Sequence, residues 1–146
     1  MQSEHTVTQL SRGNGPAVHH YYDIPIEEPD GSRIVYYEFD GDQIPGPGKV
    51  IVARADGSDA REVGRGEESI GHVGAQARWV GAGRVAYSPR QQSAGGAEIV
   101  DLDSGERQQL PYTLRSYCEP TGVGAMIGGG GGHGATHDLA RLHLDQ

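Results

Sequence analysis

A turn-and-strand unit that recurs along the chain constrains the fold more than any other feature of this sequence. Its first copy is EPDGSRIVYYEFDG, Glu28 to Gly41, which continues into KVIVARADGSDAREV, residues 49–63. Two D-G pairs in this copy are hairpin-turn signals, because glycine adopts a positive φ at almost no cost. The residues before and between these turns are rich in β-branched and aromatic side chains, as in strands. The unit therefore predicts short strands joined by tight turns.

The unit returns after about 50 residues. RIVYY, which begins at Arg33, matches RVAY at Arg84, 51 residues later, and Asp56 matches Asp103, 47 residues later. A third copy opens with EPTG at residues 119–122. A period of about 40–50 residues with four strand-sized pieces is that of a propeller blade. The sequence predicts an all-β fold, a partial β-propeller of about two and a half four-stranded antiparallel blades.

The copies divide the chain into an N-terminal strand and loop (1–18), a first blade (19–66), a second blade (67–112) and an incomplete third blade with a Gly-rich loop (113–146). TVTQL, Thr6 to Leu10, resembles the last strand of a blade, which closes the ring of a complete propeller. The segment 11–17 is expected to be a loop because it is rich in Gly, Asn and Pro. Alternation of apolar and polar residues from Tyr22 to Ile26 predicts the opening strand of the first blade.

Too few blades are present to close a ring, since propellers typically have four to eight. Either the chain is a fragment of a longer protein, which we favour, or several chains assemble to cover open blade faces and edges. The second outcome predicts self-association through those edges.

Composition excludes several classes of partner. A net charge of −8 makes nucleic acid an unsuitable partner, because phosphate binding needs clustered Lys and Arg. No run of about 20 apolar residues exists to span a membrane, and the N-terminus lacks the apolar core of a secretory signal. Cys118 is the only cysteine, so no internal disulfide can form. We therefore expect a cytoplasmic protein.

The turn-strand pattern resembles the TolB-type propeller repeat, and within that group the seven-bladed oligogalacturonate lyase family. The resemblance rests on HHYYDIPIEEPDGSRIVYYEFDG (19–41), on Gly-His-Val at Gly71 to Val73, and on the inner strand that ends in Trp79. It implies β-elimination on short uronate oligosaccharides, with an acidic oligosaccharide as partner, a histidine base, an arginine near the substrate carboxylate and a manganese-type ion held by histidines.

The family residues that do this chemistry lie in later blades, on motifs that this sequence does not contain. The resemblance therefore assigns no catalytic residue here and implies that this chain is inactive by itself. Two alternatives stay open: a non-catalytic propeller used for binding or assembly, and a truncated remnant without activity.

His20 and His72 are the candidate substrate-binding residues. Each precedes the second strand of its copy by nearly the same distance, 13 residues for His20 and 12 for His72. In a propeller this places both near the start of the innermost strand, which lines the central channel. Neutral imidazoles converging on a channel can bind a metal or take a proton. The alternative is that each satisfies a loop carbonyl.

Other motifs are better explained by structure than by chemistry. His133, His137 and Asp138 form H-x-x-x-H-D, but the glycine run before them favours a loop, and the Glu of H-E-x-x-H is missing. PGPGK at residues 45–49 fails the P-loop pattern and is expected to be a hairpin connection. Cys118 is expected to be a small core residue.

Two carboxylate pairs and a tryptophan complete the candidates. Asp101 and Asp103 fall on a strand end and its turn, where Asp favours the turn itself. Glu27 and Glu28 are neighbours in a strand and point to opposite faces, so they cannot act on one bond. Trp79 is expected to be buried between adjacent blades, with sugar stacking as the alternative.

Overall fold

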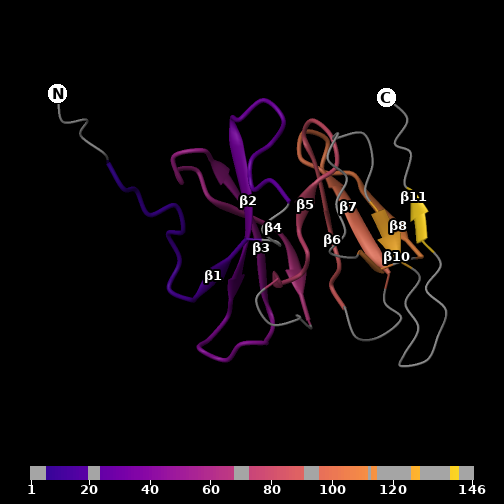
Figure 1. Cartoon of the computed structure of the whole chain (residues 1–146), viewed down its shortest axis with the longest axis horizontal. Coiled ribbons are helices and arrows are strands. Elements are labelled where there is room, and N and C mark those ends of the chain that lie inside the picture. The colour runs from indigo at the N-terminus through magenta and orange to yellow at the C-terminus, as the bar shows by residue number, and fades with distance from the viewer. Residues whose placement is uncertain are drawn as a thin grey trace.

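The structure is a computed structural model that describes residues 6–19, 24–67, 73–90, 96–111, 113–114, 126–128 and 139–141. Within these residues, eleven strands form three antiparallel sheets (Figure 1). The predicted all-β class is confirmed. No helix in the described ranges has the length and apolar character needed to cross a membrane.

The first sheet has the strand order β1-β2-β3-β4, so each strand pairs with its neighbour in sequence. Its strands are β1 (Ala17–Val18), β2 (Arg33–Phe39), β3 (Gly48–Arg54) and β4 (Arg61–Gly66). The turns have the predicted chemistry, because Gly31 and Gly57 adopt φ values of 74° and 83°. PGPGK joins β2 to β3 and enters β3 at Gly48, as the hairpin prediction requires.

The second sheet repeats this order with β5 (Arg78–Trp79), β6 (Arg84–Tyr87), β7 (Ala97–Asp101) and β8 (Arg107–Leu110). A third sheet, ordered β11-β10-β9, contains β9 (Thr113–Leu114), β10 (Met126–Gly128) and β11 (Leu139–Arg141). Two of its strands come from the Gly-rich segment and the residues after it.

The two four-stranded sheets place their sequence copies at equivalent positions. Arg33 begins β2 and pairs with Arg54, while Arg84 begins β6 and pairs with Asp101. Arg54 and Asp101, the second members of the two pairs, are 47 residues apart, which is also the offset between Asp56 and Asp103. The repeat is therefore a repeat of strand pairing.

The first and second sheets pack face to face, and the three sheets follow one another across the molecule (Figure 1). Twelve buried apolar residues form the shared core: Val35, Tyr37, Phe39, Val50, Val52 and Val63 from the first sheet, with Ala75, Ala77, Val85, Tyr87, Val100 and Leu102 from the second sheet and its connections. The opposite face of the second sheet buries Ala86 and Ile99 together with Leu114 of β9. Sheet-on-sheet packing thus links all three sheets.

The first sheet is buried on both faces. Six consecutive residues of β2, from Ile34 to Phe39, are buried, which is typical of a strand covered on two sides. The outer face of this sheet carries Ile34, Tyr36, Ile51 and Ala53, and Leu10 packs against it. The β-branched and aromatic residues of β2 are therefore buried on both faces of the sheet, because Leu10, Ala17 and Ile26 pack on the second one.

Two expectations for the N-terminal region are also wrong. Thr6–Leu10 forms no strand, because Leu10 lies on a sheet face instead of pairing with an edge. The first strand is instead β1, which begins at the last residue of the predicted loop. Just before β1, the carbonyl of Pro16 accepts a hydrogen bond from the amide of Phe39 at 2.9 Å, so pairing with β2 begins there. Ile24 to Ile26 is not a strand, while Tyr22 and Asp23 lie outside the described residues.

Candidate functional site

The histidines that the sequence singled out lie outside the part of the chain that the structure describes. This applies to His20 and His72, the candidate channel residues, and to His133 and His137 with Asp138. Cys118 and the EPTG motif also fall there. Their roles stay predictions.

A buried carboxylate, Glu28, forms the most developed polar site among the described residues. Its carboxylate accepts hydrogen bonds from Nε and Nη2 of Arg33 at 2.6 and 2.7 Å, and from the amide of Gly83 at 2.6 Å. The Ser32 hydroxyl donates at 3.1 Å. Ser32 and Arg33 lie in the loop and strand that follow Glu28, whereas Gly83 directly precedes β6 of the second sheet. Glu28 therefore connects the two sheets, and we name this group of residues, with Trp79, the sheet junction.

Charge and hydrogen bonding keep Glu28 ionised. The hydrogen bonds from Arg33, aided by the Gly83 amide, lower the pKa of this carboxyl below its ordinary value even though burial acts in the opposite direction. A general acid at neutral pH needs the reverse shift. Glu28 is thus suited to hold structure together and unsuited to donate a proton.

Trp79 completes the sheet junction. Its indole N–H donates to the carbonyl of Ile26 at 3.0 Å, and the guanidinium of Arg33 lies 5.5 Å from the ring centroid. The ring also packs against the core shared by the two sheets. Trp79 is partly buried and packs on the core between the two sheets, as the sequence predicted in part.

A second polar cluster lies at the other end of the shared core. Tyr87 donates to Glu98 at 2.7 Å, Arg107 forms an ion pair with the same carboxylate, and Gln109 donates to it at 2.6 Å. Arg107 also reaches the first sheet, where it donates to the carbonyl of Val63 at 2.7 Å. Burial, followed by the bond to Glu98, raises the pKa of Tyr87 far above its ordinary value. This cluster is a second polar connection between the sheets.

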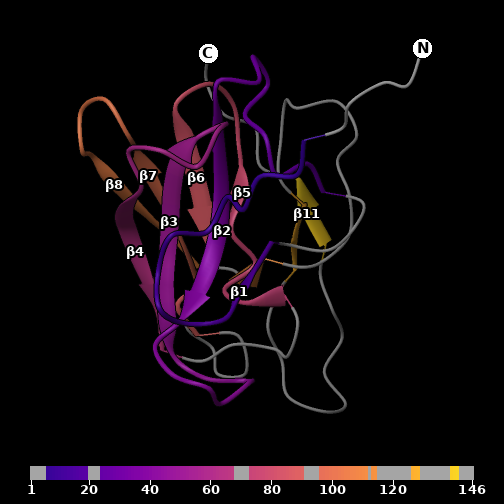
Figure 2. The same ribbon diagram turned by 90° about the vertical axis from the view of Figure 1, so that its left-hand side faces the viewer.

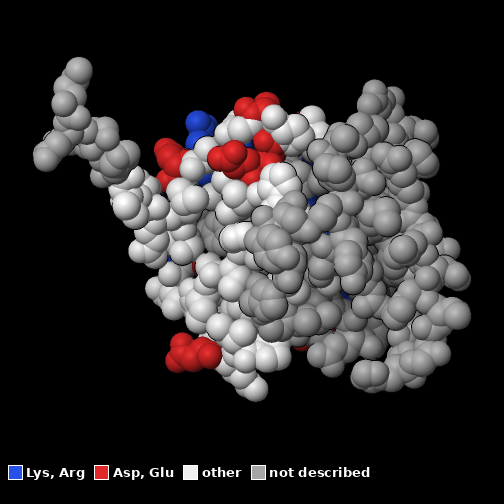
Figure 3. Space-filling view, in the orientation of Figure 1, with Lys and Arg blue, Asp and Glu red and all other residues white. Residues whose placement is uncertain are grey.

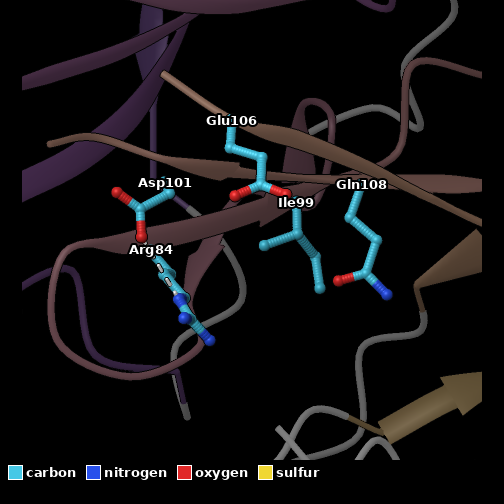
Figure 4. Close-up of a pocket in the computed structure, with 5 residues that line it drawn as sticks. All are labelled: Arg84, Ile99, Asp101, Glu106 and Gln108. Atoms are coloured by element: carbon cyan, nitrogen blue, oxygen red, sulfur yellow. Dashed lines mark hydrogen bonds and ion pairs between the residues drawn. The ribbon is translucent and has the colours of Figure 1, made fainter. Parts of the chain in front are cut away.

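A small hollow of about 120 Å³ opens on the second sheet, between residues that carry both signs of charge (Figure 4). Arg84 pairs with Asp101 at 3.4 Å on one side, and Glu106 and Gln108 line the rest around Ile99. Ligand pockets usually measure about 300–1,000 Å³. The hollow therefore suits a single small polar group.

The carboxylate of Asp101, which lines this hollow, stabilises the turn that follows β7. Amides of Ser104 and Asp103 donate to its carboxylate at 3.0 Å each and hold the pKa of Asp101 below its usual range. Asp103 itself lies in the turn and is exposed. Glu27 and Glu28 do not lie in a strand as predicted, since Glu27 forms only an isolated bridge with Ile34, but the two side chains do differ in environment, with Glu27 exposed and Glu28 buried.

Two further hollows lie at opposite ends of the first sheet. One, of about 250 Å³, is lined by Arg33, Arg54 and Arg61 with Asp59. The other, of about 440 Å³, is lined by the acidic residues Glu38, Asp40 and Asp42 together with Lys49 and the glycine-rich segment 13–15. On the face seen in Figure 3, acidic side chains gather at the upper end of this sheet, and one acidic patch lies at its lower end over the β2–β3 hairpin. The arginine-lined hollow is the better candidate for an anionic ligand.

No group of three or more His, Cys, Asp or Glu within the described ranges could hold a metal ion. The manganese-type site implied by the family resemblance therefore has no counterpart in these ranges, and we assign no metal-dependent step to their residues. Comparison with protein-family models, with curated proteins and with solved structures finds no match to this chain.

Sequence reasoning missed Glu28 as an organising residue. The signal was the five-residue spacing from Glu28 to Arg33 across a D-G turn, which brings the two side chains together once the turn folds back. The bond to Gly83 had no such signal, because it joins residues 55 positions apart.

Proposed function

We propose that this chain is a propeller-type module of stacked β-sheets that acts by binding or assembly. One observation carries the proposal: the sheets are joined to each other by side chains that reach the backbone of a neighbouring sheet or its connections. Glu28 accepts from Gly83, Trp79 donates to Ile26, and Arg107 donates to Val63. The charged groups with the richest contacts are engaged in this role, so they support an architecture built for stacking.

The proposal is tested by binding measurements on the full chain. Sedimentation equilibrium over a range of protein concentrations tests the chain against itself, and calorimetric titration with oligogalacturonate tests an acidic glycan. We expect saturable binding in at least one of the two, without formation of the unsaturated sugar that absorbs in the ultraviolet. Flat results in both would contradict the proposal.

A lyase-like role on uronate oligosaccharides is the second candidate, and the arginine-lined hollow favours it. A guanidinium binds a carboxylate through two parallel hydrogen bonds, so Arg61 suits a uronate group, whereas Arg54 already pairs with Asp59 at 2.6 Å. In this role the chain is one part of a larger enzyme and is inactive alone. The expected result is weakened oligogalacturonate binding in Arg61→Ala, with Arg90→Ala, an exposed arginine outside the hollow, as the control. Equal binding by both variants and the parent chain would remove this candidate.

A further inference from the structure

The outer face of the first sheet is apolar, and Leu10 of an irregular N-terminal segment packs on it beside Ala17 of β1 and Ile26. Ile34, Tyr36, Ile51 and Ala53 form this face, which we name the capped face, and each is at most 7% exposed. Residues 6–16, which we name the cap segment, cross it without forming a strand (Figure 2). A sheet face of this kind is normally covered by another sheet or a helix.

The repeat indicates what kind of surface the capped face is. Ile34 pairs with Ala53 directly after the first residue of β2, and Val85 pairs with Val100 directly after the first residue of β6. Val85 and Val100 belong to the core cluster through which the second sheet packs against the first. The capped face is therefore the first sheet's copy of a sheet-docking surface.

The cap segment is a small substitute for a sheet. Leu10 is its contribution to the cluster on the capped face, whereas Val7 is 95% exposed. Its polar contacts with the first sheet include the bond from Arg12 to the carbonyl of Asp56 at 3.4 Å, a backbone hydrogen bond from Arg12 to the Tyr36 hydroxyl, and the bond from the Phe39 amide to the Pro16 carbonyl. The second sheet, in contrast, covers the other side of the first with a continuous set of buried side chains.

We propose that the cap segment is a displaceable cover, and that the capped face binds a β-sheet of a second copy of this chain when the cover leaves. This inference rests on the proposed assembly function and names its partner. A second copy is the fitting occupant because the equivalent face of the second sheet packs on a sheet of this same chain. Since two copies each carry a charge of −8, their repulsion is screened by salt, and the association strengthens as ionic strength rises.

The test compares two aspartate substitutions in the full chain by sedimentation velocity at several protein concentrations. Leu10→Asp places a charge where the cap segment touches the face, and Val7→Asp places the same charge on the same segment in solvent. We expect Leu10→Asp to form dimers or larger species at protein concentrations at least tenfold below those at which the parent chain and Val7→Asp do so. A folded Leu10→Asp that stays monomeric like its control would overturn the inference.

A second substitution identifies the face. Adding Ala53→Asp to Leu10→Asp puts a charge on the capped face itself and should restore the monomer; persistent association would also overturn the inference. Emission of Trp79, the single tryptophan, checks that each variant is folded. If Leu10→Asp loses the native spectrum, Leu10→Ala replaces it and should associate in the same direction, while a monomeric Leu10→Ala overturns the inference. The oligogalacturonate titration of the parent chain tests the proposed function separately.

Discussion

Replacing Glu28 with Gln probes the sheet junction with almost no change in side-chain volume. The substitution removes the charge that accepts from Arg33 twice and from Gly83 once. It also turns an amide NH₂ toward groups that are themselves donors. The Glu28 side chain is 3% exposed, whereas Arg33 is 27% exposed and can regain part of its hydration. Hydrogen bonds to charged groups contribute about 1.5–3 kcal/mol, so we expect Glu28→Gln to lower the free energy of unfolding by about 2–3 kcal/mol.

The assay is urea unfolding followed by the fluorescence of Trp79, which lies in the same junction. With a slope of about 1–3 kcal/mol per molar urea, the midpoint should fall by about 0.7–3 M. Glu27→Gln is the matched control, because Glu27 is the exposed neighbour of Glu28, and it should change stability by less than about 0.5 kcal/mol. Equal midpoints for the two variants would refute the assigned role of Glu28.

The difference between the parent chain and Glu28→Gln should also depend on pH. The pKa of Glu28 is lowered in the folded protein, so its contribution is complete above the ordinary value of 4.5 and is lost as the pH falls through the lowered folded value. The two unfolding curves should therefore converge in acid. A constant difference from neutral to acid pH would contradict the role of the ionised carboxylate.

Three further outcomes follow from the packing. Gly64→Ala should cost about 1–3 kcal/mol, because its Cβ would lie 2.3 Å from Cζ of Tyr87, whereas Gly41→Ala, which faces open space, should be neutral in thermal unfolding. Burial raises the pKa of Tyr37 from its ordinary value of 10.0 to about 12 in the folded protein. The neutral phenol therefore stabilises the fold fully below pH 10.0, and this stabilisation is lost as the pH rises through the folded pKa. Tyr37→Phe should make the alkaline loss of stability less steep. Leu114→Ala should cost about 2–5 kcal/mol, since Leu114 is fully buried against the second sheet, and a neutral result would contradict that packing.

The strands and their turns followed from the sequence because local chemistry determines them. β2 and β3 are runs of β-branched and aromatic residues, and the turn between β3 and β4 contains Gly57 at a positive φ. The matching spacing of Arg33 and Arg84 then indicated that the two copies would pair in the same way. These features need no knowledge of distant contacts.

The cap segment and the sheet junction could not be predicted in the same way. The alternation in TVTQL fits a strand, but a strand must also pair with the edge of a sheet. Leu10 instead packs on the apolar outer face of the first sheet. Likewise the hydrophobic pattern assigns the charged residue Glu28 to the surface. The cost of removing its carboxylate from water is offset by the ion pair with Arg33 and the hydrogen bond from the distant Gly83 amide. Both outcomes depend on contacts between segments far apart in sequence.

The most direct test of the stacked first and second sheets is hydrogen exchange at the Trp79 indole. The chain contains one tryptophan, so a single indole N–H resonance reports the bond to the Ile26 carbonyl at 3.0 Å across the sheet junction. If the two sheets form one cooperative unit, this proton exchanges only through global unfolding, with the free energy that urea unfolding gives. Exchange at the rate of a free indole in the folded protein would contradict the packing on which the proposed function and the capped face both depend.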